Sequence, residues 1–356
     1  MEVLQVWAGE KAYRQIRDNG LQASDVFAVA GAAGGPKWIT LQQIDKFLFG
    51  EWFAGRQDPL YLMGSSAGSW RFAAALAFDD PIEGLHRFKE AYFSQVYTGK
   101  PTPEEVSRLF IAATRDLISP ESVQHILSHP YGRVAIFTAR AKGWMASENL
   151  QVQGLGFLMA LLTNAVSRNA LGYWFQRVVF QDARIQMPLF RTHEFDTRLA
   201  HLDTANFSDA LMGSSAIPLV LAGVKDIAGA PVGVYRDGGM TDYHMALPYV
   251  VPENKVVLLP HFFAEVIPGW LDKYLKHRKP LAKDMEQVVL VCPSREFIET
   301  LPGGKIPDRK DFEKLSDRER LQAWEKAYRD CAVLGDTFAT WVLNGKIREK
   351  VKLWKL

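Results

Sequence analysis

The chain has 356 residues, 48% of them hydrophobic, and its 42 Lys and Arg against 40 Asp and Glu leave a net charge of +2. This balance argues against a nucleic-acid partner, and the hydrophobic content is enough for the core of a large α/β domain. The N-terminus lacks a secretory signal pattern, no stretch reaches the length of a membrane span, and the two cysteines, Cys292 and Cys331, stand in no metal-binding spacing. We therefore expect a cytoplasmic protein without a disulfide framework or a zinc site.

Strand-like apolar runs alternate with helical segments along the chain, a pattern typical of parallel α/β sheets. The expected strands are 27–32, 59–64, 133–139, 176–181, 189–194, 232–236, 255–259 and 287–291. No internal repeat or linker interrupts them, so residues 1–356 are expected to form one domain with a mainly parallel central sheet. Catalytic groups in such folds lie at the carboxyl ends of strands.

The first of these strands ends in a loop of small residues that reaches Gly34 and Gly35. Backbone N–H groups in such a loop can converge on an anion. A P-loop is disfavoured, because Pro36 and Trp38 stand where that motif needs a glycine and a hydroxyl, and no register matches a dinucleotide fingerprint. The interpretation that survives is an oxyanion hole. Pro36 has no N–H, so Gly34 and Gly35 are the expected donors.

The second strand runs into residues 64–68, which match G-x-S-x-G with Gly64 and Gly68 at the ends, and a helical segment follows. This order is typical of a nucleophile elbow, in which the glycines let strand and helix pass closely while a serine is held at a tight turn. Ser66 is the serine in register. The helix N-terminus favours a developing oxyanion, and the N–H of Ala67 adds a donor.

The strand at 232–236 breaks at Asp237, Gly238 and Gly239. Taken alone, Asp-Gly also fits an ordinary turn. Taken with the elbow, a carboxylate held by glycines at a strand end can accept the proton of a serine hydroxyl, and it would do so best if burial raised its pKa.

Histidine is the alternative base, because hydrolases with the same elbow commonly use one. His244 lies shortly after Asp237, and His261 follows a strand-like run. A structural role fits both of them as well. Loss of activity in Asp237→Asn with retention in the two histidine variants would favour the Ser–Asp pair.

Taken in order, the glycine loop, G-x-S-x-G, the small-residue stretch at 214–218 and Asp-Gly-Gly resemble the motifs of the patatin-like phospholipases, over residues 25–250. The resemblance implies a three-layer α/β/α fold and a serine acyl hydrolase that uses a Ser–Asp dyad without a metal or cofactor. The roles it implies are nucleophile for Ser66, general base for Asp237, oxyanion donors for Gly34 and Gly35, and basic loop residue for Lys37. Ala33 and Trp38 depart from the outer glycines of the family loop, and Trp38 places a bulky ring where the loop enters its helix.

Outside these motifs the segments are less specific. Residues 140–180, rich in large apolar side chains, fit a lid over the serine and fit core helices equally well. The aromatic and basic run at 262–279 is expected to be a buried amphipathic helix. Residues 251–356 are expected to add strands and peripheral helices, with helices at 294–343. The tail at 346–356 is expected to be a docked strand, in preference to a membrane-surface anchor.

We therefore expect an enzyme that cleaves acyl esters of a phospholipid or glyceride through an acyl-enzyme on Ser66. The expected partners are the lipid or acyl-ester substrate and, transiently, a membrane surface. A soluble carboxylesterase for small acyl esters is the alternative within the same class. A lipid-binding module, silent because Trp38 distorts the oxyanion loop, is the alternative from another class.

Overall fold

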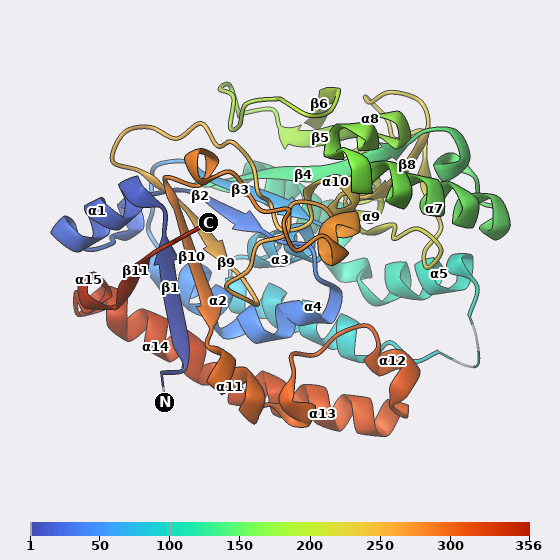
Figure 1. Cartoon of the computed structure of the whole chain (residues 1–356). Helices are drawn as coiled ribbons and strands as arrows, with labels where there is room; N and C mark the ends of the chain where they lie inside the picture. The colour runs from blue at the N-terminus through green and yellow to red at the C-terminus, as the bar shows by residue number, and fades with distance from the viewer. Residues whose placement is uncertain (1, 98, 100) are drawn as a thin grey trace.

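The computed structural model describes residues 2–97, 99 and 101–356. Within them, eleven strands form one central sheet with helices on both sides (Figure 1). The order across the sheet is β11-β1-β10-β9-β2-β3-β4-β5-β6, with β8 paired to β4 and β7 paired to β8. The strands are β1 (Leu4–Ala8), β2 (Val26–Gly31), β3 (Leu60–Ser65), β4 (Gly132–Ala141), β5 (Phe175–Asp182), β6 (Thr197–Leu202), β7 (Val224–Lys225), β8 (Val234–Asp237), β9 (Val256–Pro260), β10 (Val288–Pro293) and β11 (Val351–Leu353).

Several helices begin at signals visible in the sequence. The side chains of Asp80, Thr102 and Ser119 each accept a hydrogen bond from the first turn of their helix, and a proline follows each of them. The α-helices are α1 (Glu10–Asn19), α2 (Gln42–Phe47), α3 (Ala67–Leu76), α4 (Pro81–Phe93), α5 (Pro103–Ala113), α6 (Pro120–Ser128), α7 (Leu150–Val166), α8 (Leu171–Trp174), α9 (Phe207–Ser215), α10 (Gly239–Asp242), α11 (Arg295–Thr300), α12 (Asp311–Lys314), α13 (Asp317–Asp330), α14 (Ala332–Leu343) and α15 (Ile347–Lys350). Two 3-10 turns bear on the site, η2 (Gly35–Leu41) and η7 (Trp270–Tyr274).

The sheet is mainly parallel, as expected from the alternation of strands and helices. The neighbours from β10 through β9, β2 and β3 to β4 are all parallel, and β2, β9 and β10 are buried along their whole length. Such continuous burial is typical of strands covered on both faces. Strands β1 and β10 and strands β4 and β5 are antiparallel.

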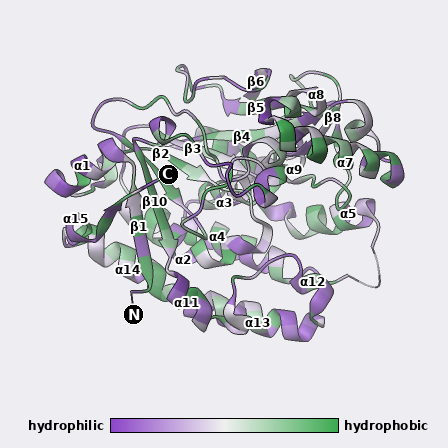
Figure 2. Ribbon diagram, in the orientation of Figure 1, coloured by the Kyte–Doolittle hydropathy of each residue, from purple (hydrophilic) through white to green (hydrophobic). Residues whose placement is uncertain are grey.

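The two faces of the sheet are covered unequally. One face packs against a large apolar layer that includes α2, α3, α4 and α14. The other is covered by the loops at 185–190 and 245–251 and by the C-terminal residues, with α7 and α8 over the ends of β4 and β5. Figure 2 shows hydrophobic residues concentrated on the central strands, whereas hydrophilic residues are frequent on outer helices such as α1 and α13. The fold is therefore the expected α/β/α arrangement, with a large helical layer on one face and, on the other, a smaller layer in which loops accompany α7 and α8.

The expected strand at 189–194 is wrong. This segment makes only an isolated bridge between Phe190 and Tyr249. Leu189 and Phe190 are buried because they lie on one face of the sheet, not because they pair within it. Strands β1, β6 and β7 were not expected. The tail does form a docked strand, since β11 pairs in parallel with β1.

The expected helix over 262–279 is also wrong. Apart from η7, the segment is irregular. Its fold depends on buried Asp272, whose carboxylate accepts hydrogen bonds from the backbone N–H of Gly269 at 2.9 Å and from Arg168 at 2.7 Å. The local bond to Gly269 and the distant partner Arg168 together hold a turn where the sequence pattern favours a longer helix.

Three further observations complete the fold. Cys292 and Cys331 are both free and buried. No helix in the described part of the chain is long and apolar enough to cross a membrane. The same residues contain no group of three or more His, Cys, Asp or Glu side chains arranged to hold a metal ion.

Candidate active site

Strand β4 brings the two halves of the site together. Along one edge of β4, β3 pairs in parallel and ends with Ser65 opposite Phe137. At the next position of the same edge, Asp237 pairs with Thr138, because β8 approaches β4 in the antiparallel direction and ends there. The carboxyl ends of β3 and β8 therefore meet head to head. This places Asp237 beside Ser66, the residue that follows β3.

The turn at Ser66 has the backbone geometry of a nucleophile elbow. Ser66 has φ 53° and ψ −124°, a conformation that non-glycine residues rarely adopt, and the first turn of α3 begins directly after it. A Cβ at Gly64 would lie 2.6 Å from the N of Ser69, and a Cβ at Gly68 would lie 2.0 Å from the backbone O of Gly31. Both glycines therefore permit a close approach of strand and helix that other residues would prevent.

Ser214 supports the elbow from the other side. Its hydroxyl accepts a hydrogen bond from the backbone N–H of Ser66 at 2.8 Å and donates one to the carbonyl of Phe137 at 2.7 Å. The carbonyl of Ser214 also accepts a hydrogen bond from the N–H of Gly238. Sequence reasoning included Ser214 only in a resembling motif and did not predict this positioning role. The small-residue stretch at 214–218 was the signal available for it.

The Ser66 hydroxyl donates a hydrogen bond to Oδ2 of Asp237 at 2.8 Å, and Oδ1 of Asp237 accepts one from the N–H of Gly239 at 2.7 Å. Burial raises the pKa of Asp237, against the lowering effect of these two hydrogen bonds. A Cβ at Gly238 would lie 2.1 Å from the carbonyl O of Phe137, so glycine is needed where the chain passes the end of β3. The arrangement can remove a proton from the serine hydroxyl.

The two histidines weighed as bases do not contact the Ser66 hydroxyl. His244 accepts a hydrogen bond from the N–H of Ile267 at 3.0 Å, and His261 uses its Nδ1 on the backbone of Phe263. Burial lowers the pKa of His244 well below its usual value and that of His261 to about 4, so both rings are neutral near pH 7. They pack against each other with ring centroids 4.2 Å apart.

Backbone N–H groups are available beside the serine. In the described residues, the N–H groups of Gly34, Gly35 and Ala67 have no hydrogen-bond acceptor, whereas the N–H of Ala33 donates to the carbonyl of Tyr243 at 2.8 Å. Gly34 and Gly35 line the same cavity as Ser66. Gly35 has φ +55°, which favours glycine, and turns the loop into η2. The three predicted oxyanion donors thus lie around the elbow.

Trp38 lies away from this cavity. Its side chain is 1% exposed and packs against Phe88 and Tyr92, with ring centroids 4.5 and 5.7 Å from its own. The bulky ring that replaces a family glycine is therefore accommodated in the core beneath the loop.

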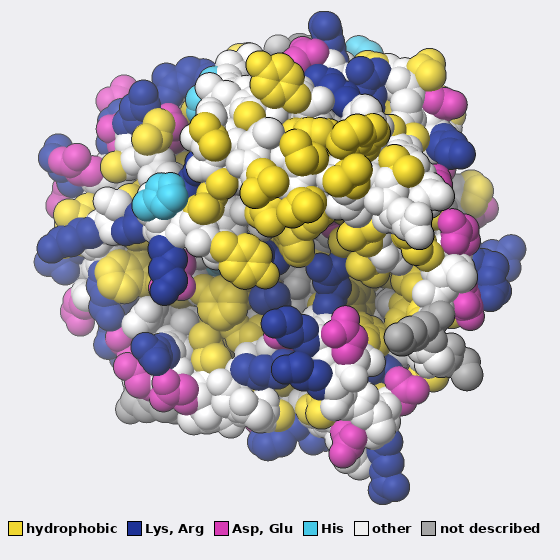
Figure 3. Space-filling view, turned by 45° about the vertical axis from the view of Figure 1, so that its right-hand side comes forward, with side chains coloured by type: hydrophobic (Ala, Val, Ile, Leu, Met, Phe, Trp, Pro, Cys, Tyr) yellow, Lys and Arg dark blue, Asp and Glu magenta, His cyan; other side chains and the backbone are white. Residues whose placement is uncertain are grey.

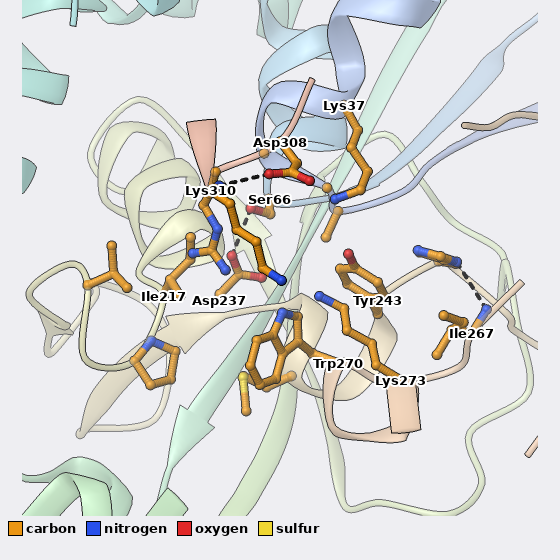
Figure 4. Close-up of a pocket in the computed structure, with 18 of the residues that line it drawn as sticks. Lys37, Ser66, Ile217, Asp237, Tyr243, Ile267, Trp270, Lys273, Asp308 and Lys310 are labelled. Carbon is orange, nitrogen blue, oxygen red and sulfur yellow. Dashed lines mark hydrogen bonds between the residues drawn. The ribbon is translucent and has the colours of Figure 1, made fainter. Parts of the chain in front are cut away.

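Ser66 and Asp237 open onto a cavity of about 580 Å³ (Figure 4). One part of its wall is apolar, and another part carries cationic side chains. The apolar lining residues are Ala33, Phe157, Ile217, Pro218, Leu219, Val220, Met240, Phe263, Ile267 and Trp270. The charged lining residues besides Asp237 are Lys37, Lys273, Asp308, Arg309 and Lys310. Such a wall can hold an acyl chain on one side and a charged group on the other.

The raised pKa of buried Asp237 predicts how kcat/KM for ester hydrolysis falls at acid pH. Asp237 can accept the serine proton only when ionised, and its pKa is raised above the usual 3.8 by burial. We expect kcat/KM for ester hydrolysis to fall as the pH drops through this raised value. A pH series on a neutral ester would measure this fall, and a midpoint at or below 3.8 would contradict the burial effect.

Comparison with known proteins identifies one family. A family model described as patatin-like phospholipase matches residues 49–247, more than half of the chain. The match includes the elbow at Ser66 and the turn at Asp237, and it begins after the glycine loop. Residues beyond 247, among them Lys273 and Arg309, also lie outside it. No curated protein matches the chain.

Proposed function

The chain belongs to the patatin-like phospholipase family, a family of lipid acyl hydrolases, and from this premise we propose that it cleaves carboxylic acyl esters of lipids through an acyl-enzyme on Ser66. The observation that supports this most directly is the 2.8 Å hydrogen bond from the Ser66 hydroxyl to Asp237 at the wall of a cavity. A serine hydroxyl becomes an effective nucleophile when a base takes its proton as the new bond forms.

In the proposed reaction, Ser66 Oγ attacks the ester carbonyl carbon while Asp237 takes the hydroxyl proton. The N–H groups of Gly34, Gly35 and Ala67 stabilise the tetrahedral oxyanion, and each such donor contributes about 3 kcal/mol to the barrier reduction. The intermediate collapses, the bond to the alcohol oxygen breaks, and protonated Asp237 returns its proton to that oxygen. Asp237 then takes a proton from water, which attacks the carbonyl carbon of the acyl-enzyme. The bond from that carbon to Ser66 Oγ breaks, protonated Asp237 returns its proton to Oγ, and the carboxylic acid is released.

Labelling with a fluorophosphonate probe tests the proposed nucleophile. We expect covalent capture at Ser66 in the folded protein and loss of capture in Ser66→Ala, because the probe reacts only with an activated hydroxyl. Failure of the folded wild-type protein to react would favour a silent binding module.

Nitrophenyl esters of increasing chain length, run beside phospholipid vesicles, decide the substrate class. Preference for short esters without vesicle activity would favour a soluble carboxylesterase.

Contact with a lipid surface is also proposed, and α7 supports it. The side of this helix that faces the protein carries small or polar residues, including Gly156, Ala160 and Asn164. Its outer side exposes large apolar residues, of which Leu155, Leu158 and Leu162 are each about half exposed. Figure 3 shows hydrophobic side chains gathered on this part of the surface, with Lys and Arg side chains below them. A surface helix usually turns its large apolar side chains toward the core, whereas α7 turns several of them outward. This arrangement suits a helix that lies against lipid.

The position of α7 relates this surface to the active site. Phe157, on the same helix, lines the cavity that contains Ser66 and packs edge-on against Trp270 with ring centroids 5.4 Å apart. Of the segment 140–180, the two ends belong to β4 and β5, and we therefore propose that only the part between these strands, residues 142–174, forms a cap. The outer side of this cap meets the lipid surface while its inner side borders the acyl site.

Replacement of Leu155, Leu158 and Leu162 together by Gln is expected to weaken sedimentation with phospholipid vesicles at least about tenfold, because each exposed leucine loses apolar area that it would bury in lipid. Hydrolysis of a monomeric short-chain ester should change by less than about threefold, since these side chains point away from the core. Leu343→Gln, at an exposed leucine on α14, is the matched control and should bind vesicles as the wild type does. Equal vesicle binding by the triple variant would contradict the proposed surface.

A further inference from the structure

Four cationic side chains line the cavity beside Ser66, namely Lys37, Lys273, Arg309 and Lys310. In Figure 4 the amino groups of the three lysines point into the space in front of Ser66 and Asp237. No carboxylate of the described residues forms a salt bridge with any of the four cations. The wall therefore has an excess of positive charge without a protein counter-ion.

The two carboxylates of the same wall are already engaged. Asp237 accepts hydrogen bonds from Ser66 and Gly239. Asp308 forms a salt bridge with Lys305 at 3.4 Å and accepts a hydrogen bond from the backbone N–H of Lys310 at 2.8 Å. Neither carboxylate forms a salt bridge with the four cations, so their N–H groups remain available to an incoming anion.

Lys273 is held in position by its neighbour Asp272. That buried carboxylate forms salt bridges with Arg168 at 2.7 Å and Arg278 at 3.1 Å and accepts a hydrogen bond from Asn164 at 2.7 Å. Because Asp272 is fixed by these partners, the η7 turn is fixed as well, and the Lys273 ammonium lies over the rings of Tyr243 and Trp270, 4.3 and 4.5 Å from their centroids. A cation on a rigid turn loses little freedom when it binds a ligand.

Arg309 lies over the glycine loop. A Cβ at Gly35 would come within 3.2 Å of Arg309 Cγ, so the side chain crosses the loop that supplies the predicted oxyanion donors. Nη1 of Arg309 is buried and has no hydrogen-bond partner in the structure. A buried N–H left unpaired is costly, and a ligand with acceptor oxygens would satisfy it.

Two partly buried lysines of this wall have lowered pKa values, chiefly because the wall removes their ammonium groups from water. Burial lowers the pKa of Lys37 to about 8, against the raising effect of the Asp308 carboxylate and with smaller lowering effects from Arg309 and Lys305. Burial lowers the pKa of Lys273 to about 7, with further lowering effects from Lys37 and Arg309 that outweigh the attraction of Asp237 and Asp308. An anion bound between them would favour their charged forms.

We propose that Lys273 and Arg309, together with Lys37, form a subsite that holds the phosphate group of a phosphorylated acyl ester while its acyl carbonyl lies at Ser66. The guanidinium fork of an arginine and the ammonium groups of lysines suit phosphate oxygens. This inference rests on the proposed function. Lys273 and Arg309 lie beyond the matched residues 49–247, so the C-terminal part of this chain supplies two of the three cations of the subsite.

The test compares two monomeric esters with the same acyl chains, dihexanoylphosphatidylglycerol and uncharged dihexanoylglycerol. The wild type should prefer the phosphate-bearing ester in kcat/KM. Lys273→Gln and Arg309→Gln should each reduce that preference about tenfold, mainly through KM, because each removes a charge-assisted hydrogen bond. Lys273→Arg should keep most of the preference. The matched controls, Lys276→Gln and Arg318→Gln, alter exposed cations outside the cavity and should behave as the wild type does.

A second readout does not depend on catalysis. Inorganic phosphate should raise the thermal unfolding temperature of Ser66→Ala, and should raise it less when Lys273→Gln is added. If this holds while no variant hydrolyses either ester, the proposed function fails and the anion subsite stands. Equal kcat/KM for the two esters in an active wild-type enzyme would overturn the inference. This holds even if inorganic phosphate raises the unfolding temperature, because the phosphate of the substrate would then not be recognised.

The pH dependence gives a third check. The charge of a phosphodiester is constant between about pH 6 and about pH 9, so a change in preference over that range reports on the protein. The wild-type preference should fall severalfold as the pH rises and Lys273 and Lys37 lose their protons. The charged or titratable groups beside them are Asp237, Asp308, Asp311, Lys305, Arg309, Tyr243 and His244. In Lys273→Arg the fall should be shallower, and a fall of the same size would overturn the assignment to Lys273.

Discussion

Asp237→Asn is expected to lower kcat/KM for acyl-ester hydrolysis by about 1,000- to 10,000-fold, because the amide cannot accept the proton of the Ser66 hydroxyl. The variant should nevertheless fold. Burial raises the pKa of Asp237 above 3.8, so ionisation costs folding free energy that is absent at low pH, where both states are protonated, and grows as the pH rises through the folded pKa. At pH 7 the neutral amide avoids this cost, and its thermal unfolding temperature should equal or exceed that of the wild type.

Hydrolysis of a nitrophenyl ester and fluorophosphonate labelling would measure this effect, with the unfolding temperature recorded for every variant. His261→Gln alters the alternative base that lies outside the cavity lining, and Asp209→Asn alters an exposed carboxylate on α9. Each should retain activity within about tenfold of the wild type. If Asp237→Asn stayed active while His261→Gln lost activity, a histidine would be the base, and the 2.8 Å contact would be structural.

Gly68→Ala is expected to lower the free energy of unfolding by about 3 kcal/mol or more, because overpacking against backbone leaves no side chain that can move aside. The new Cβ would lie 2.0 Å from the carbonyl O of Gly31, at the end of β2. The better helix propensity of alanine, about 1 kcal/mol, cannot offset that clash. The shift of β2 away from α3 would also displace the glycine loop that follows β2, so activity should fall with stability.

Urea unfolding followed by tryptophan fluorescence would measure this change. Gly154→Ala is the matched control, because it is a helical glycine with no atom within 4 Å of the added Cβ. That variant should be as stable as the wild type or more stable by up to about 1 kcal/mol. Equal urea midpoints for Gly68→Ala and Gly154→Ala would show that β2 and α3 do not approach each other as closely as the structure has them.

The sequence predicted those parts of the protein that depend on a few consecutive residues. The elbow at 64–68 is one, because glycines at its ends and a serine between strand and helix define the turn locally. The apolar runs of β2, β9 and β10 are another, because buried parallel strands are apolar throughout. Strand β1 was missed, although its buried residues Leu4, Val6 and Ala8 alternate with half-buried ones as in a strand with one covered face. The strand is short, so this alternation extends over few residues.

The sequence failed where an apolar segment can be buried in more than one way. Leu189 and Phe190 are apolar because they cover a face of the sheet, and no local pattern separates that role from a strand. The segment at 262–279 has the composition of an amphipathic helix, but Asp272 is held by Asn164 and Arg168, which are distant in the chain, as well as by the nearby Arg278. Such charge pairing is visible only after folding.

By itself, then, the sequence determined Ser66 as the prime candidate nucleophile, the glycines around it, and Asp237 as one of a few candidate bases. The tertiary structure decided which base lies at the hydroxyl, because β8 runs antiparallel to β4 and ends where β3 ends. It also decided that cations from three distant segments share the wall of one cavity. The physical reason is the same in both cases. Conformation at a turn is set by neighbouring residues, whereas the meeting of distant side chains is set by strand pairing and loop packing across the whole sheet.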